Sequence, residues 1–413
     1  MRAAAASVSG VGWRRWGVVA VLFLLAFLTI IDRVSVSAAK TDMARELGLS
    51  DMTFGWVFGV FAIGYAILMV PSGWWADRYG PRRFLTLIVV LWSLFTALTG
   101  AVRDAAVLIG MRFLFGLAEA GAFPGAARAI YNWLPVRERG LALGLLNTGS
   151  RMGAAIGLAV VSWSVVRFGW RLTFGMLGIL GGVWALGWFG WFRDHPAAEP
   201  NAERAEVKPA SMNWEALLGS ANTYFILFQY FAGNFTFFIC FSWLLPYLRE
   251  RYALGAQEAG LLASVPLYCG ACATWTSGFL VDWIYKRGRW ALSRRLPAVL
   301  GFALAICGLL AAAHMPTAGS FIVCFAITTF GADLTLSPSW TVSSDVGGKY
   351  TGTLSGAMNM LGSVGSFASA VTFPWLLGLT GSVKAYFWLA ALLDVAAIVC
   401  WCRVDPRKRL PQQ

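Results

Sequence analysis

The sequence predicts an all-α polytopic membrane protein with twelve transmembrane helices, arranged as two pseudo-symmetric six-helix bundles. Three observations predict this fold. Hydrophobic residues make up 58% of the 413 residues and charged residues only 13%, whereas an average soluble protein carries about 25% charged residues. Twelve apolar runs are long enough to cross a bilayer core, which needs about 20 residues per helix. Short motifs also recur at an offset of about half the chain.

The charge balance and the scarcity of polar residues exclude most other classes of protein. The net charge of +13 comes from 33 Lys and Arg against 20 Asp and Glu. A nucleic-acid-binding protein sets its basic residues on a polar surface, which this composition does not provide, so we expect a lipid bilayer and no nucleic acid as partner. Seven Cys lie in apolar stretches, and neither they nor the two His form a cluster with metal-ligand spacing. We therefore expect no cofactor and no metal.

The expected spans follow the apolar runs in order. The first run comes after Arg14-Arg15 and resembles a signal peptide, but Asp32-Arg33 interrupts it and its apolar part is long for one, so we expect a retained helix. The longest polar stretch follows the sixth run, which divides the chain into an N-terminal bundle (1–192), a cytoplasmic linker (193–220) and a C-terminal bundle (221–413). The twelve runs cover residues 16–38, 53–72, 83–101, 105–131, 140–166, 172–192, 221–248, 257–281, 292–313, 319–341, 351–377 and 385–402.

The distribution of Lys and Arg predicts the orientation in the membrane. With the N-terminus inside, 21 of them fall on the cytoplasmic side and 8 on the other. Cytoplasmic loops carry the excess of positive charge in membrane proteins. Both termini are therefore expected in the cytoplasm, with the chain in the plasma membrane, as in a bacterial inner membrane. The four remaining basic residues lie within spans and are Arg33, Arg112, Arg128 and Arg151.

Three motifs of the first half recur in the second. Internal duplication is common in transporters, which bind substrate near the membrane midplane between the two repeats. The repeats therefore favour a transporter over an enzyme or a channel, for which we find no nucleophile–base pair and no long pore-lining repeat. The recurring motifs are Ser72-Gly73-x3-Asp77 with Ser277-Gly278-x3-Asp282, Gly140, Gly144, Asn147 and Gly153 with Gly352, Gly356, Asn359 and Gly365, and Glu119-x4-Pro124 with Asp333-x4-Pro338.

The loop after the second span reads Gly73-x3-Asp77-Arg78-x-Gly80-x-Arg82-Arg83. It resembles the signature loop of the major facilitator superfamily, and the likeness extends over the whole chain. Four further motifs narrow it, namely Asp32-Arg33, Arg112-x6-Glu119-x4-Pro124, Trp243-Leu244-Leu245-Pro246-Tyr247-Leu248 and Gly352-x3-Gly356-x2-Asn359-x2-Gly362. With these motifs the chain is similar to the anion:cation symporter family. Members of that family import organic anions, often hexonates, hexuronates or glucarate, with H+ or Na+, and animal relatives carry sialic acid, glutamate or phosphate.

Charges within the first and fourth spans are the candidates for substrate binding and coupling, since charges inside a bilayer are costly and mark functional sites. Arg33 is expected to clamp an anion through two parallel hydrogen bonds. Arg112 and Glu119 lie two turns apart on one helix face. The resemblance implies that Asp32 and Glu119 are the proton-coupling acids. The alternatives are that Asp32-Arg33 only ends a helix, and that Glu119 forms a permanent structural pair with Arg33 or Arg112.

Neutral polar and aromatic residues are expected to recognise the rest of the substrate. Tyr65, Trp340 and Asn359 match family positions that face the cavity, although ordinary helix packing also explains them. Family members that carry sugar acids often have Gln where this chain has Ser150, and Arg151 follows it. We count Ser150 among the substrate-binding residues. The departure weakens the prediction of a hexonate and leaves a dicarboxylate or an aromatic acid open.

The signature loop is expected to act as a conformational latch. In the resemblance, Asp77 accepts hydrogen bonds from Arg residues and from a helix of the other half, which holds the outward-open state. A solvated turn that obeys the positive-inside rule explains the Arg residues equally well. The residues assigned to the latch are Gly73, Asp77, Arg78, Gly80, Arg82 and Asp282.

Together these features predict a proton-coupled importer of a small organic anion, such as a sugar acid or related carboxylate, that works by rocker-switch alternating access. The alternative is a facilitator-type exporter of drugs or a uniporter of neutral sugars, against which Arg33 argues. The chain is not expected to be an enzyme, and we expect a monomer coupled to H+ rather than Na+. Asp333, Asp394, Arg128 and Arg151 receive no role from the sequence.

Overall fold

The computed structural model describes residues 2–194, 219–348, 351–408 and 410. Most of the expected linker, residues 195–218, lies outside the described residues. The described chain is helical and lacks strands. The helices of the first half are α1 (Arg2–Leu47), α2 (Asp51–Tyr79), α3 (Pro81–Thr99), α4 (Ala105–Glu119), α5 (Ala122–Trp133) and α6 (Val136–Trp191). Those of the second half are α8 (Ala221–Ser242), α9 (Leu244–Arg251), α10 (Ala256–Lys286), α11 (Trp290–Ala312), α12 (Ala318–Leu334), α13 (Leu336–Gly347), α14 (Thr351–Thr380) and α15 (Lys384–Arg403).

These helices account for the twelve expected passes. Ten helical runs of the described chain are long and apolar enough to cross a membrane. One of them, Leu141–Trp191, covers two expected passes, because α6 bends at Gly169, whose backbone has the positive φ of 78° that glycine adopts without steric cost. The remaining pass is α10, which has 31 residues but carries polar side chains along its length. The fold class predicted from the sequence is therefore confirmed.

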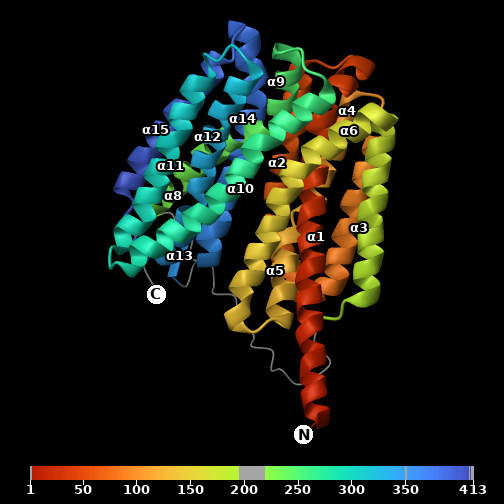
Figure 1. The fold of residues 1–413 in the computed structure, drawn as a ribbon, viewed down its shortest axis with the longest axis vertical. Helices are drawn as coiled ribbons and strands as arrows, with labels where there is room; N and C mark the ends of the chain where they lie inside the picture. The colour runs from red at the N-terminus through yellow and green to blue at the C-terminus, as the bar shows by residue number, and fades with distance from the viewer. Residues whose placement is uncertain (1, 195–218, 349–350, 409, 411–413) are drawn as a thin grey trace.

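The helices form two bundles, α1–α6 and α8–α15, which lie side by side (Figure 1). Glycines of the repeated motifs let helices approach closely in both. A Cβ at Gly153 of α6 would collide with the carbonyl oxygen of Phe27 in α1, and a Cβ at Gly365 of α14 would collide with that of Phe231 in α8. Small residues at such contacts allow the backbones of membrane helices to pack tightly. The repeated motif, whose two copies lie 212 residues apart, therefore marks equivalent helix contacts in the two bundles.

A helix break occurs at the same place in each bundle. α4 ends at Glu119 and α5 begins at Ala122, while α12 ends at Leu334 and α13 begins at Leu336. Pro124 and Pro338 lie in the first turn after each break, where a missing backbone N–H costs little. Each break therefore places an acidic residue, Glu119 or Asp333, at or next to the end of a buried helix.

The two bundles are tied together at the end of the molecule opposite the start of α1, which we call the far side (Figure 1). There α2 packs on α14 and α6 packs on α10. A Cβ at Gly55 would lie 2.9 Å from Pro374 Cγ, and one at Gly260 would lie 2.7 Å from Ser162 Oγ. Ser37 Oγ donates a 2.7 Å hydrogen bond across the interface to the carbonyl oxygen of Ser242.

Ion pairs reinforce this far-side contact. Lys40 at the end of α1 is buried, and its Nζ lies 2.5 Å from Glu250 of α9 and 2.6 Å from Asp51 of α2. Arg249 of α9 lies 3.3 Å from Asp42 of α1. Two of these three pairs join one bundle to the other. The far side is therefore closed in this structure by small-residue packing and by charge.

Candidate functional site

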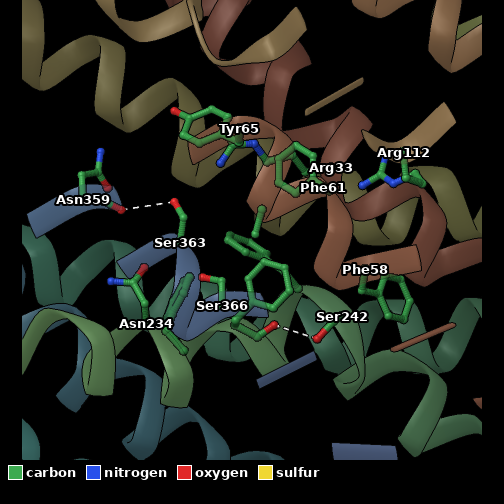
Figure 2. A pocket seen from close by; sticks show the side chains of 14 residues that line it. Arg33, Phe58, Phe61, Tyr65, Arg112, Asn234, Ser242, Asn359, Ser363 and Ser366 are labelled. Carbon is green, nitrogen blue, oxygen red and sulfur yellow. Dashed lines mark hydrogen bonds between the residues drawn. The ribbon is translucent and has the colours of Figure 1, made fainter. Parts of the chain in front are cut away.

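A cavity of about 150 Å³ lies between the two bundles (Figure 2). One wall comes from α1, α2 and α4 and carries two arginines among aromatic rings. The other comes from α8 and α14 and carries amides and hydroxyls beside phenylalanines. The lining residues are Arg33, Phe58, Phe61, Ala62, Tyr65, Arg112, Asn234, Phe237, Phe238, Phe241, Ser242, Asn359, Ser363 and Ser366.

Arg33 is held at the cavity wall by Glu119. Its Nε donates to both carboxylate oxygens of Glu119, at 3.0 and 3.1 Å. Its guanidinium lies 4.6 Å from the ring centroid of Tyr65 and 5.2 Å from that of Phe61, distances at which cation–π attraction operates. One terminal nitrogen, Nη2, is buried without a hydrogen-bond partner among the described residues. The pair leaves Arg33 with donors free for a ligand.

Glu119 is fully buried, and this carboxylate is paired with Arg33 rather than with Arg112. Arg112 instead lies over aromatic rings, 4.6 Å from the centroid of Phe115 and 5.1 Å from that of Phe61. Its Nε is buried and lacks a hydrogen-bond partner in the described chain. Asp32 is buried on another face of α1 and is not part of the cavity lining.

The opposite wall offers neutral hydrogen-bonding groups that the sequence reasoning missed, apart from Asn359. Asn234 donates to the carbonyl oxygen of Tyr230 at 2.8 Å, so its amide oxygen remains available. Ser363 and Ser366 donate to carbonyl oxygens one turn earlier in α14, at 3.2 Å in each case. Asn234 is an amide in an apolar run, a signal that could have identified it, although Gln229 of the same run gives the same signal and instead accepts from Ser339 and Trp401. The serines give no comparable signal, because serine hydroxyls in membrane helices often bond to their own helix.

Two residues predicted to bind substrate lie away from this cavity lining. Ser150 of α6 has a buried hydroxyl that lacks a partner among the described residues. Trp340 of α13 is 43% exposed and packs edge-on against Tyr230, with ring centroids 6.3 Å apart. Tyr65 and Asn359 do line the cavity. The structure thus brings Arg33, Tyr65 and Asn359 together and leaves Ser150 and Trp340 outside.

The predicted latch residues contact their own bundle in this conformation. Asp77 lies 3.4 Å from Arg128, and both side chains are partly exposed. The backbone N–H of Arg82 donates to Asp194 at 2.8 Å, and its guanidinium donates to the carbonyl oxygen of Phe189.

Of the other latch residues, Gly73, Arg78 and Gly80 lie near Asp77 at the end of α2, and Asp282 lies in the repeated motif near the end of α10. Gly80 has a φ of 77°, and a Cβ there would lie 2.9 Å from the carboxylate of Asp194. Arg78 lies over the ring of Trp74, whereas a Cβ added at Gly73 would meet no atom within 4 Å. Asp282 is exposed. The contact with the opposite bundle that the resemblance implies is not made among the described residues in this state.

Two further buried acids lie outside the cavity lining. Asp333 of α12 pairs with Arg151 of α6, with Nη2 2.8 Å from Oδ1, so this pair joins the two bundles. Asp394 of α15 accepts from the hydroxyl of Thr236 in α8, 3.0 Å from each carboxylate oxygen. Asp394 therefore stays within the second bundle, while Asp333 bridges both.

The sequence of this chain is similar to a family model and to several named transporters along most of its length. The family model of the Major Facilitator Superfamily matches residues 22–370. The chain is 31% identical to the probable sulfoacetate transporter of Cupriavidus necator, with 92% of both chains covered. It is 28% identical to the probable galactarate/D-glucarate transporter of Escherichia coli, covering 95% of this chain and 94% of that one. It is 29% identical to the hexuronate transporter of Bacillus subtilis, with 92% of both covered.

Solved structures show the same fold at low sequence identity. The bacterial homolog of the human lysosomal transporter Spinster, in its inward-facing and occupied conformation, superposes with a TM-score of 0.79 at 19% identity, covering 97% of this chain and 99% of that one. A nucleoside transporter superposes with a TM-score of 0.74 at 13% identity, covering 94% of this chain and 99% of that one. These likenesses concern the fold alone.

Proposed function

Because the chain belongs to the major facilitator superfamily, we propose that it is a secondary active transporter that imports a small organic anion by proton-coupled symport. The observation that carries this proposal is Arg33, which lines the cavity between the bundles and is paired with the buried Glu119. A guanidinium recognises a carboxylate or a sulfonate through parallel hydrogen bonds. Sulfoacetate, galactarate, glucarate and hexuronates, after which the relatives are named, are all anions of this kind.

The rest of the cavity supports a small acid with polar groups along its length. Arg33 and Arg112 place positive charge on one wall, and Asn234 and Asn359 place amides on the other (Figure 2). Ligand sites of this type combine flat apolar surface with a few convergent polar groups that fix orientation. The anionic end of the substrate binds at Arg33, and its hydroxyl or carbonyl oxygens face the amides and serines.

Proton coupling follows from competition for Arg33. When Glu119 is ionised, it holds the guanidinium through two hydrogen bonds. A proton on Glu119 removes the negative charge, so the ion pair weakens and Arg33 turns its donors toward the anion. Asp32, one residue before Arg33 and buried, is the second coupling acid. The loaded carrier therefore holds substrate and protons together, which avoids an uncompensated charge in a low-dielectric site.

The far side is assigned to the outside of the cell, which makes this structure an inward-facing state. Both termini and the linker 193–220 then lie in the cytoplasm, in a chain that crosses the plasma membrane of a bacterium as a monomer. The two bundles, residues 1–192 and 221–413, rock about the central cavity. In the outward-facing state Asp77 contacts the opposite bundle and latches the cytoplasmic side.

The proposal is tested with purified protein in liposomes. Sulfoacetate, galactarate and glucuronate are offered under an inward proton gradient, an inward sodium gradient or neither, with glucose as the neutral comparison. We expect accumulation of at least one acid under the proton gradient alone. Accumulation that follows the sodium gradient would contradict proton coupling. Uptake of glucose without uptake of any acid would favour a neutral-sugar uniporter.

A further inference from the structure

The Arg151–Asp333 pair joins the two bundles, whereas the Arg33–Glu119 pair lies within the first, and the two pairs are buried to a similar extent. Arg151 keeps 20% of its side chain exposed, whereas Asp333 keeps only 3%. Among the described residues, the guanidinium of Arg151 makes a single hydrogen bond, from Nη2 to Asp333 Oδ1. A guanidinium has five N–H donors. Most of the binding capacity of Arg151 is therefore unused in this state.

Arg151 lies directly behind a wall of the substrate cavity. Its guanidinium is 5.2 Å from the ring centroid of Phe237, and Phe237 lines the cavity. Ser150, the preceding residue, has a buried hydroxyl without a partner in the described chain. The Phe237 ring thus stands between the cavity and the guanidinium of Arg151.

Asp333 is only half satisfied by this pair. Its Oδ2 is buried without a hydrogen-bond partner in the described chain, and it lies against α10 where Gly270 leaves room, because a Cβ at Gly270 would collide with it. From α8, Cys240 approaches Thr329 in the preceding turn of α12. From α11, Gly301 faces Gly331. Arg151 is the cation that faces Asp333 among the charged residues described here.

From this geometry we propose that Arg151 is a second anion-binding residue, used by substrates that carry two acidic groups. This inference rests on the proposed function. The first acidic group binds Arg33, and the second displaces Asp333 from Arg151. The displaced Asp333 accepts one proton from solution and becomes a neutral acid, because an ionised carboxylate without its partner is costly in this buried position. The hydrogen bond from Arg151 to Asp333 breaks and hydrogen bonds from Arg151 to the substrate form.

The number of acidic groups on the substrate sets how many protons enter with it. A monoanion needs one arginine released from its carboxylate partner, and a dianion needs two. The dianion therefore enters with one proton more than the matching monoanion. Arg151 thus sets the choice between mono- and dianionic acids, and Asp333 is the positioning residue that keeps Arg151 neutralised until a second acidic group arrives.

The test uses two matched pairs of ligands that differ in one acidic group. Galactarate is compared with galactonate, and sulfoacetate with isethionate, by competition for binding and by uptake in liposomes. Arg151→Gln is expected to weaken the dianion of a pair about tenfold or more, the effect of losing a hydrogen bond to a charged group, and the monoanion much less. Arg151→Lys retains part of the preference. The control is Arg167→Gln, an exposed residue on the same helix α6, which changes neither.

Asp333→Asn provides an independent readout. In this variant Arg151 has no carboxylate partner, so no proton has to be taken up to release it. Binding of the dianion is therefore retained but loses its extra dependence on pH, and the extra proton carried per dianion disappears. Equal loss of mono- and dianion binding in Arg151→Gln, or an unchanged proton count in Asp333→Asn, would overturn the inference and make the pair a structural tie. Failure of the wild type to bind any of the four acids would instead count against the proposed function itself.

Discussion

Arg33 and Glu119 form a pair in which the Nε of Arg33 donates to both carboxylate oxygens at 3.0 and 3.1 Å, while its Nη2 is buried and finds no partner in the part of the chain that the structure describes. The pair joins α1 to α4, and its arginine lines the cavity. A buried ion pair contributes little net stability, so stability alone gives no reason to keep it there. Its geometry suits an exchange of partners, in which an anion replaces Glu119.

Glu119→Gln is expected to uncouple transport from protons. The amide cannot take up or release a proton, but it leaves Arg33 free to bind the anion. Accumulation against a gradient in liposomes is lost, whereas exchange of labelled for unlabelled substrate across the membrane continues. Loss of both activities in folded protein would show that Glu119 is needed for binding rather than for coupling.

Arg33→Gln is expected to weaken binding of the anion about tenfold to a hundredfold, because it removes a charged, bidentate donor. Arg33→Lys restores only part of the affinity, since an ammonium is a point charge without the planar fork of a guanidinium. Competition binding measures both. The exposed Arg167→Gln serves as the control for charge removal. Unaltered affinity in Arg33→Gln would remove Arg33 from the site.

Gly153→Ala is expected to destabilise the first bundle by about 1–3 kcal/mol, the usual cost of overpacking, because its Cβ would collide with the carbonyl oxygen of Phe27. Gly187→Ala on the same helix is the matched control, since a Cβ there meets open space. Gly187→Ala is expected to leave the stability unchanged or to raise it, because alanine is preferred over glycine in a helix. Thermal unfolding in detergent compares the two. Equal melting temperatures would contradict the close α1–α6 packing.

Lys40→Gln is expected to open the far side. Lys40 is buried between Glu250 and Asp51, so its loss leaves two carboxylates without their shared cation. The population shifts away from the conformation described here, and a cysteine placed at Ser37 in a background lacking the native cysteines reacts faster with a reagent added from outside. The exposed Lys384→Gln is the control. Unchanged labelling in Lys40→Gln would mean that packing alone closes this side.

The sequence predicted the fold, which the structure confirms, and it singled out the charged residues of the candidate site for a different physical reason. The spans and their repetition follow from hydrophobic length and from motif spacing, which report directly on the membrane passes. Arg33 and Glu119 stand out because charges within apolar runs are rare and costly. The sequence left open whether Glu119 pairs with Arg33 or with Arg112, and the structure pairs it with Arg33.

The neutral side of the site and the interbundle pair were harder to predict. Asn234, Ser363 and Ser366 line the cavity, but a helix pattern does not say which polar face turns to the centre and which bonds to its own backbone. Arg151 and Asp333 lie 182 residues apart and in different bundles, so their contact depends on how the bundles meet. Ser150 and Trp340 were assigned to the cavity by family position, and local packing places them outside its lining.

The most direct test of the central claim measures anion and proton together. Liposomes containing the protein and a luminal pH dye receive an inward gradient of substrate with no pH gradient imposed and with the membrane potential clamped. We predict that substrate entry acidifies the lumen, and that Glu119→Gln carries substrate by exchange without this acidification. Entry of the anion with an unchanged luminal pH in the wild type would contradict proton-coupled release of Arg33.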